Sequence, residues 1–432
     1  MNKSIFDVMI VGAGPAGLMA AKKASELGLD VCVVEIKKDF NKVERACSMQ
    51  FIMDEGYEGE SMQVTNDKLI FPKNQFSVDY HGDIVPVYNK YYHSPSDHII
   101  HFSNSSKDTQ EPFAIKFDKQ KLLAGLYESC LGENVTFYLN THALHGKDYD
   151  DYVELEVATD GKHQTLHGKK LIIAEGVNAR LCETFGLSST RTHFATAHTV
   201  KYFLEGVKGI EPNSWNLFYG TVYHSNVPVI IGPSLQGDHI LEMTVTGDSY
   251  RKPDQIYQEL FQSGPLSSLL KDAKLIKKNG CTLKALSSLK TPYKGNVLAI
   301  GDTAAFVEVE TQGALMCGYH AAESIAEELK GNPGFETYTK WWVDSFEFNS
   351  EDYLKVSQGY ALVPTYTDKE LDYLFALIEE EQLEGTYSQY KTPKLIWEAI
   401  LTHKERIQSE QPAIYAKILK MNQLTLGDSL KK

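Results

Sequence analysis

The sequence lacks the features that mark secreted, membrane-spanning and metal-cluster proteins. Its six cysteines are scattered, and no two have the C-x-x-C spacing that zinc and iron–sulfur sites commonly use. No apolar run approaches the roughly 18 residues that a membrane-spanning helix needs. The N-terminal stretch MNKSIFDVMIVGAG leads into glycines and not into a signal-peptide cleavage site. We therefore expect a cytoplasmic protein with no bound metal and no disulfide framework, at most in peripheral contact with a membrane.

Positive charge is also scarce. Lys and Arg total 43 against 57 for Asp and Glu, which gives a formal net charge of −14. An acidic excess repels phosphate backbones, so nucleic acid is not an expected partner. The 432 residues exceed the roughly 150 of a typical domain, and 42% of them are apolar. Two or more structural units with a sizeable core are therefore predicted.

The first forty residues have the pattern of a strand, a glycine-rich turn, a helix and a second strand. Gly12 suits a tight turn, Gly14 lets the backbone approach a diphosphate, and Gly17 lets the helix pack on the sheet. The second apolar run ends at Glu35, where a carboxylate can accept hydrogen bonds from ribose hydroxyls and would repel a 2′-phosphate. The pattern predicts a dinucleotide site but does not choose between FAD and NAD. The expected contacts are Gly12, Gly14, Pro15, Ala16, Gly17 and Glu35.

A second strand-end motif lies about 290 residues later. The apolar run 296–300 reads as a strand, and Gly301-Asp302-Thr-Ala-Ala leaves its end. A helix rich in small residues follows from about Gln312-Gly313-Ala314. Small side chains let such a helix lie close to a neighbour or a cofactor.

This second motif resembles the second FAD fingerprint of a broad flavoprotein superfamily, which contains the aromatic hydroxylases, the geranylgeranyl reductases and the electron-transfer-flavoprotein dehydrogenases. The resemblance implies FAD as the cofactor. It implies that Gly301 and Asp302 lie at the ribityl or pyrophosphate part of FAD, and that Gln312, Gly313 and Ala314 lie beside the pyrimidine edge of the flavin. A helix N-terminus at that edge stabilises the negative charge that reduced flavin holds near N1.

Two further segments carry the same resemblance. Residues 170–180 are similar to a middle motif in which a strand ends in Asp-Gly, here Glu175-Gly176. Arg45-Ala46-Cys47 follows the second strand, where relatives place an Arg on the adenosine–ribityl side of FAD or a Cys facing the substrate. The resemblance therefore implies cofactor contacts for Arg45, Ala46 and Gly176, and a place for Cys47 at the substrate face.

The predicted fold class is α/β. We expect a Rossmann-type FAD-binding domain of the glutathione-reductase type, interrupted by an antiparallel-sheet substrate domain and followed by a helical C-terminal region. The expected FAD-binding parts are 1–60, 116–190 and 286–333. The expected substrate-sheet insertion is 61–115, the antiparallel substrate domain 191–285, and the helical region 334–432.

No second glycine fingerprint follows a strand, so electrons are expected from a diffusing NAD(P)H or from a protein donor such as ferredoxin. Three kinds of chemistry stay open. The favoured one is hydride transfer from flavin N5 to a carbon–carbon double bond of a hydrophobic or conjugated small molecule. The alternatives are hydroxylation of an aromatic substrate by a monooxygenase and electron transfer to another protein.

Three side chains are candidate proton donors or pocket residues. Cys47 can serve as a thiol donor, or it can simply be a small buried residue. Tyr223 and His224 lie on a stretch that relatives turn toward the flavin. That stretch, 222–228, keeps the Tyr and the Pro of the aromatic-x-Trp-x-Phe-Pro signature of geranylgeranyl reductases but lacks its Trp. The prenyl substrate therefore stays open even if the reductase class holds.

Overall fold

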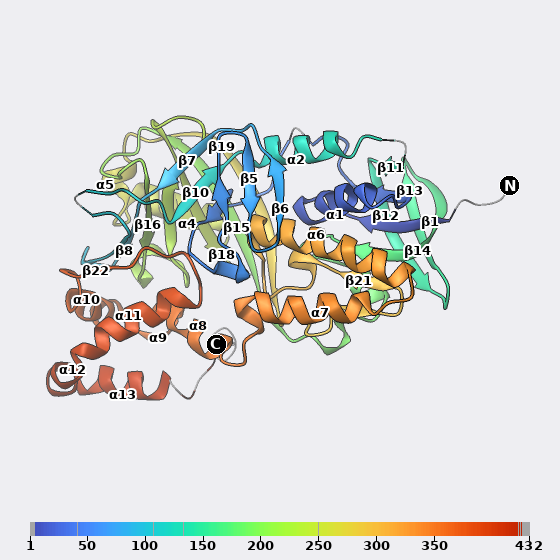
Figure 1. Ribbon diagram of the computed structural model, residues 1–432. Helices are drawn as coiled ribbons and strands as arrows, with labels where there is room; N and C mark the ends of the chain where they lie inside the picture. The colour runs from blue at the N-terminus through green and yellow to red at the C-terminus, as the bar shows by residue number, and fades with distance from the viewer. Residues whose placement is uncertain are drawn as a thin grey trace.

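The computed structural model describes residues 5–40, 42–106, 108–132, 134–248 and 250–421, together with residues 423 and 425. Figure 1 shows two main sheets beside each other, with helices α1 and α6 over one of them and the C-terminal helices below the other. No helix in this described part of the chain is long and apolar enough to cross a membrane.

The first main sheet is parallel at its centre, in the order β11-β2-β1-β14-β21. Its strands are short apolar runs with helices packed against them, as parallel strands require. The first half of the long strand β14 instead pairs antiparallel with β13, and β13 with β12. The strands are β1 (Phe6–Val11), β2 (Val31–Val34), β11 (Val135–Tyr138), β12 (Thr141–Asp148), β13 (Val153–Thr159), β14 (Lys162–Ile173), β20 (Tyr293–Lys294) and β21 (Val297–Ala299).

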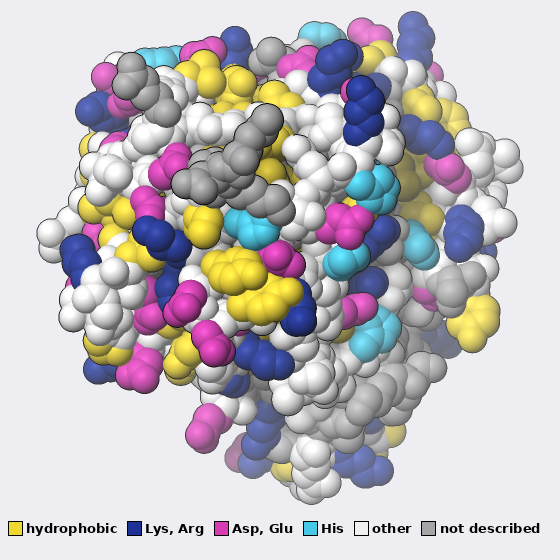
Figure 2. All heavy atoms as spheres, turned by 90° about the vertical axis from the view of Figure 1, so that its right-hand side faces the viewer, with side chains coloured by type: hydrophobic (Ala, Val, Ile, Leu, Met, Phe, Trp, Pro, Cys, Tyr) yellow, Lys and Arg dark blue, Asp and Glu magenta, His cyan; other side chains and the backbone are white. Residues whose placement is uncertain are grey.

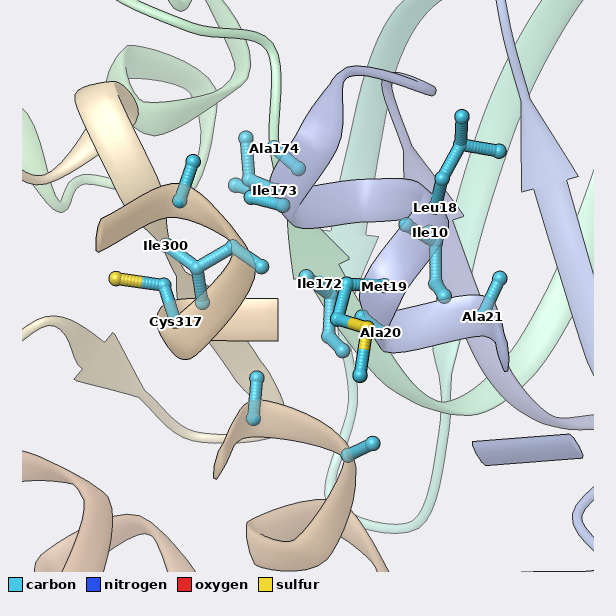
Figure 3. Close-up of a cluster of buried hydrophobic side chains, with 14 of the residues drawn as sticks. Ile10, Leu18, Met19, Ala20, Ala21, Ile172, Ile173, Ala174, Ile300 and Cys317 are labelled. Carbon is cyan, nitrogen blue, oxygen red and sulfur yellow. The ribbon is translucent and has the colours of Figure 1, made fainter. Parts of the chain in front are cut away.

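Helix α1 (Pro15–Glu26) and helix α6 (Glu310–Leu329) lie against this sheet and against each other. Figure 3 shows the buried cluster between them, in which Ile10, Met19, Ile172 and Ile300 meet. A Cβ on Gly318 would come 2.2 Å from the Ala16 carbonyl oxygen, so only glycine allows this helix contact.

The second main sheet has the order β19-β15-β18-β17-β16-β8-β9-β22 and is antiparallel except for the β16–β8 and β22–β9 pairs. One face packs on α4 (Pro253–Gln262) and α5 (Ser267–Leu270) through an apolar cluster. Its strands are β8 (Asn89–His93), β9 (Ile99–Ser103), β15 (His193–Glu205), β16 (Ser214–Phe218), β17 (Val229–Pro233), β18 (Ile240–Gly247), β19 (Lys274–Leu286) and β22 (Gln382–Leu383).

Two three-stranded sheets and short helices complete the N-terminal two thirds. The small sheets have the orders β3-β10-β7 and β4-β5-β6. Their strands are β3 (Gln50–Ile52), β4 (Gln63–Val64), β5 (Lys68–Phe71), β6 (Phe76–Asp79), β7 (Ile84–Val87) and β10 (Ala114–Phe117). The helices are α2 (Lys119–Ser129) and α3 (Leu181–Thr184), with the 3-10 turns η1 (Tyr57–Gly59), η2 (Ser188–Thr190), η3 (Thr221–Tyr223) and η4 (Gly301–Thr303).

The C-terminal region is helical, as expected from its amphipathic pattern. Its helices are α7 (Gly334–Ser345), α8 (Tyr353–Ser357), α9 (Leu362–Thr365), α10 (Asp368–Ala376), α11 (Lys391–Thr402), α12 (Lys404–Glu410) and α13 (Pro412–Met421), with turns η5 (Glu347–Asn349) and η6 (Gln358–Tyr360). Helices α9 to α13 share a buried cluster with strands β8, β9 and β16 of the second main sheet, whereas α7 packs into the buried cluster of the first main sheet.

The expected fold class is confirmed. Before Tyr223 the chain leaves the second sheet, because β16 ends at Phe218 and Gly220, with φ 140°, turns the chain into η3. The face opposite the second sheet carries acidic and basic side chains interspersed with histidines and small hydrophobic groups (Figure 2).

Candidate functional site

A cavity of about 530 Å³ lies where β1, β14 and β21 end and where α1 and α6 begin. Both glycine motifs line it, although they are about 290 residues apart in the sequence. The carboxyl ends of parallel strands are the expected position for a ligand in such a sheet. The predicted residues on its wall are Gly12, Gly14, Pro15, Ala16, Glu35, Arg45, Cys47, Gly176, Gly301, Asp302 and Ala314.

The three glycines of the first motif do different things. Gly12 has φ 99°, and a Cβ there would come 2.3 Å from the Ala174 carbonyl oxygen. A Cβ on Gly17 would come 1.8 Å from the Gly12 carbonyl oxygen, so Gly17 serves the packing of α1 and does not line the cavity. A Cβ on Gly14 would meet nothing within 4 Å, which leaves an open cradle at the N-terminus of α1. That helix has no side-chain cap, so its first N–H groups can bind a diphosphate.

Glu35 lies at the end of β2 and is 5% exposed. The Ala13 N–H donates to Glu35 Oε2 at 2.6 Å, and the Lys37 N–H donates to Oε1 at 2.7 Å. Each carboxylate oxygen keeps a lone pair for a further donor. Because Glu35 lines the cavity together with Thr141, its position fits contact with ribose hydroxyls.

Asp302 and Arg45 face each other across the middle of the cavity. The Val309 N–H donates to Asp302 Oδ1 at 3.0 Å, which ties the start of α6 to this wall. Arg45 Nη1 lies 3.6 Å from the position that a Cβ on Gly176 would take. The Arg45 segment is held in place by a bridge to Gly280 of β19. The residues of the two fingerprints and of the middle motif therefore fit the diphosphate and ribityl parts of a flavin dinucleotide.

Besides Gly17, three of the predicted cofactor contacts lie off the cavity wall. The Gln312 side chain is bonded to the backbone of β3, because its Oε1 accepts from the Ile52 N–H at 2.7 Å and its Nε2 donates to the Ile52 carbonyl at 3.1 Å. Gly313 lies beside Glu58, and Ala46 is 7% exposed. The first residue of α6 that lines the cavity is Ala314.

Tyr223 and His224 are not brought to the cavity either, which corrects their predicted place. Tyr223 packs into the apolar cluster under α4, and its hydroxyl donates to the Ser94 carbonyl at 3.4 Å. His224 Nε2 lies 3.6 Å from Glu259 of α4. The chain turns at Gly220, so the two side chains lie on the opposite face of the second sheet from the cavity.

Cys47 lies at the cavity among cations. Lys119 Nζ is 3.5 Å from its Sγ, and Lys201 of β15 donates to its carbonyl oxygen. Burial acts to raise the pKa of the Cys47 thiol, but Lys119 and Lys201 outweigh it and hold this pKa below its ordinary value. The thiolate is therefore more accessible here than in an ordinary cysteine.

Behind Cys47, Glu242 of β18 binds two buried lysines at once. Lys201 Nζ lies 2.5 Å from Glu242 Oε2, and Lys116 of β10 contacts the same oxygen. Their exposed fractions are 3% for Lys201, 0% for Lys116 and 2% for Glu242. Burial lowers the pKa of Lys116 to about 8.

The sequence analysis missed these lysines and also Lys119 and Arg180, which line the cavity. The sequence does contain a pattern that could have predicted the two buried lysines. Lys116 lies in Ala-Ile-Lys-Phe and Lys201 in Val-Lys-Tyr-Phe, and a lysine inside an apolar strand run is seldom buried without a partner.

Residues 6–232 match the protein family described as pyridine nucleotide-disulphide oxidoreductase. The chain is also similar to curated proteins called digeranylgeranylglycerophospholipid reductase. It is 23% identical over 378 residues to reductase 2 of Methanosphaera stadtmanae, a match that covers 85% of this chain and 89% of the relative. It is 23% identical over 390 residues to the reductase of Methanocaldococcus jannaschii, with 88% and 92% covered.

Solved structures give the same fold. A geranylgeranyl bacteriochlorophyll reductase-like protein from Thermoplasma acidophilum has a TM-score of 0.72 and 16% identity, covering 97% of this chain and 100% of the other. The p-nitrophenol 4-monooxygenase of Pseudomonas putida has a TM-score of 0.58 and 12% identity, covering 97% and 99%. These likenesses describe the architecture and leave the reaction open.

Proposed function

Since the chain belongs to the pyridine nucleotide-disulphide oxidoreductase family and is an FAD-dependent oxidoreductase, we propose that it reduces carbon–carbon double bonds of a hydrophobic isoprenoid lipid. The relatives called digeranylgeranylglycerophospholipid reductase match over 85% and 88% of the chain. The observation that supports the reductase best is that Cys47, predicted at the substrate face, lines the same cavity as the two fingerprints.

The residues of the cavity would hold FAD along its length. Glu35 would bind the adenosine ribose, and the Gly14 cradle at the start of α1 would bind the diphosphate. Asp302 and Arg45 would lie at the ribityl side, which leaves Cys47 and Lys119 at the reacting end. When bound, FAD supplies a hydride at flavin N5.

Cys47 shapes the reacting end through its charge. Because Lys119 and Lys201 favour its thiolate, Cys47 orients polar groups of the substrate or cofactor better than it donates a proton. The buried Lys116–Glu242–Lys201 group fixes this end by holding the Cys47 carbonyl oxygen. Electrons would come from a diffusing NAD(P)H or from a protein donor such as ferredoxin.

The test uses the whole protein loaded with FAD and reduced without oxygen. After incubation with a geranylgeranyl ether lipid, mass spectrometry should find a gain of two hydrogen atoms for each bond reduced. A gain of one oxygen atom in the presence of air would instead identify a monooxygenase. Recovery of an unchanged lipid and of unchanged aromatic substrates, with electrons passed only to a second protein, would identify an electron-transfer subunit.

The electron donor can be determined in the same preparation. Rapid bleaching of the flavin absorbance by NAD(P)H in a stopped-flow instrument would identify a self-sufficient reductase. Bleaching only by reduced ferredoxin would identify a protein donor. The variant Gly14→Val is the matched control, because its side chain would fill the open cradle without touching the protein around it.

A further inference from the structure

Four glutamates from three segments of the chain meet beside the FAD cavity. Glu58 comes from η1, Glu308 and Glu310 from the start of α6, and Glu347 from η5. Together with Tyr57 and Tyr353 they line a cavity of about 20 Å³. A polar cavity of that volume has room for about one water molecule.

The carboxyl cluster is anchored to the FAD site by backbone contacts. Glu308 and Glu310 flank Val309, whose N–H donates to Asp302 Oδ1 at 3.0 Å. Asp302 in turn lines the FAD cavity. Glu310 also adopts a left-handed backbone with φ 55°, which is uncommon for a residue other than glycine and is concentrated at functional sites. These contacts hold the two glutamates beside the FAD cavity, where the charges of Cys47 and Lys119 on the cavity wall act on Glu310.

The buried carboxyl group of Glu58 indicates that this cavity holds a proton or a water molecule. It is 4% exposed, and its Oε2 atom has no hydrogen-bond partner within the described part of the chain. A Cβ on Gly313 would come 2.4 Å from this oxygen, so glycine at that position leaves the space that the carboxyl group fills. A buried ionised carboxylate without a donor would be costly, whereas a protonated carboxyl group is tolerated.

The charges around the cluster favour the neutral acids. Burial raises the pKa of Glu58 well above its ordinary value, and Glu310 and Glu347 raise it further. Burial also raises the pKa of Glu310, with Glu308 and Cys47 adding to the effect. Burial raises the pKa of Glu308 to about 6, although Arg45 and Lys119 act in the opposite direction.

The pKa values of Glu347, Tyr57 and Tyr353, which complete the cluster, are raised as well. Burial raises the pKa of Glu347 and outweighs the hydrogen bond from Ser388 Oγ at 2.8 Å. Burial also raises the pKa of Tyr57 and Tyr353, so these hydroxyls stay protonated. The other charged or titratable groups that face the cluster are Asp54, Asp302, Tyr387 and Lys394.

The charges around Cys47 act in the opposite direction from those around these glutamates: they lower the pKa of Cys47 and raise the pKa of the glutamates. Lys119 and Lys201 beside Cys47 favour the anion, whereas the neighbours of Glu310 favour the neutral acid. Glu310 therefore holds its proton more firmly than an ordinary carboxyl group, and Cys47 holds its proton less firmly than an ordinary thiol. The proton needed beside the reacting double bond has a better source in Glu310 than in the thiol that the sequence suggested.

We propose that Glu310 is the acid that protonates the substrate and that Glu58 and Glu308 return the proton to it, an inference that rests on the proposed reductase function. The O–H bond of Glu310 breaks, and a C–H bond forms at the carbon next to the one that receives the hydride. The π bond of the substrate supplies the electron pair for that C–H bond, and reduced FAD supplies the hydride. Glu310 is left as a carboxylate and takes its next proton through the cluster from solvent.

The experiment measures the carboxyl protons directly and the turnover separately. Infrared spectra of the FAD-loaded protein are recorded across a pH series, because the C=O stretch of a protonated carboxyl group is distinct from that of a carboxylate. The variants are Glu310→Gln and Glu58→Gln, and the control is Glu336→Gln on the exposed side of α7. Glutamine resembles the protonated acid in shape, so the two cluster variants are expected to fold and to keep their FAD.

At neutral pH the wild-type spectrum should contain protonated carboxyl bands that each cluster variant reduces and that Glu336→Gln leaves unchanged. Glu310→Gln should slow double-bond reduction by roughly 10²–10⁴-fold, the usual contribution of a general acid. Spectra without such bands, or full turnover in Glu310→Gln, would overturn the inference. If the bands behave as expected but the wild-type protein reduces no double bond, the proposed reductase function is wrong. The inference that Glu310 protonates the substrate is then refuted as well.

Discussion

Replacing Glu242 with glutamine tests the buried group behind Cys47. The change keeps the shape of the side chain but removes the carboxylate that contacts both Lys116 and Lys201, which are 0% and 3% exposed. Removing one partner of a buried ion pair typically costs about 3–5 kcal/mol, because the remaining charge has no partner and no water. We expect Glu242→Gln to lower the free energy of unfolding by that amount at pH 7.

The stability penalty of Glu242→Gln should also change with pH in a definite direction. Lys116 has a pKa of about 8 in the folded protein against 10.5 for a free lysine, a difference worth about 3 kcal/mol. Between these values the unfolded chain binds more protons than the folded one, so stability from this group rises with pH. The penalty of Glu242→Gln should therefore shrink above pH 8, as Lys116 loses its proton.

Urea denaturation at pH 7 and at pH 9.5 measures both effects. Glu259→Gln is the matched control, because Glu259 forms an exposed pair with Arg251, and losing such a pair should change the stability little. The further substitution Lys116→Met should recover part of the loss in the Glu242→Gln background. A penalty no larger than that of Glu259→Gln, or one that grows with pH, would refute the assignment of a buried ion triad.

Three further predictions concern the cavity. Gly318→Ala should destabilise the protein by about 1–3 kcal/mol in urea denaturation, because the new Cβ would come 2.2 Å from a carbonyl oxygen of α1, whereas Gly125→Ala, with nothing closer than 4.0 Å, should not. Gly14→Val should keep the stability of the FAD-free protein but lose bound flavin, as measured by absorbance after reconstitution; a variant that retains FAD would show that the cradle is not used. Lys119→Met should raise the pKa of Cys47, so the rate of its alkylation should rise at a higher pH than in the wild type; an unchanged profile would exclude Lys119 as the cause.

The sequence was a good guide wherever backbone geometry decides the outcome. Gly12 and Gly301 were predicted to lie at strand ends, and both line one cavity with positive φ angles of 99° and 63°, because a tight turn there leaves few alternatives to glycine. The α/β class and the antiparallel second sheet follow from runs of apolar residues in the same way.

Side-chain partners between distant elements were not predictable. The side chain of Gln312 forms two hydrogen bonds with the backbone of Ile52, 260 residues away, and no local sequence pattern predicts them. The position of Tyr223 depends on the backbone of Gly220, where a single turn sends the side chain to the other face of the sheet. The carboxyl cluster likewise depends on η1, α6 and η5 meeting in space.

The contact between α1 and α6 has a consequence for how the molecule is made. The first fingerprint leaves the ribosome early, but strand β21, which pairs with β14 in the same sheet, and the close-fitting Gly318 follow about 290–300 residues later. Until then β14 lacks its neighbour β21 and α1 lacks its contact with α6, and long-range contacts of this kind form slowly. The flavin site is therefore completed only late in synthesis. Once FAD binds, it contacts both fingerprints and can hold these two distant parts of the fold together.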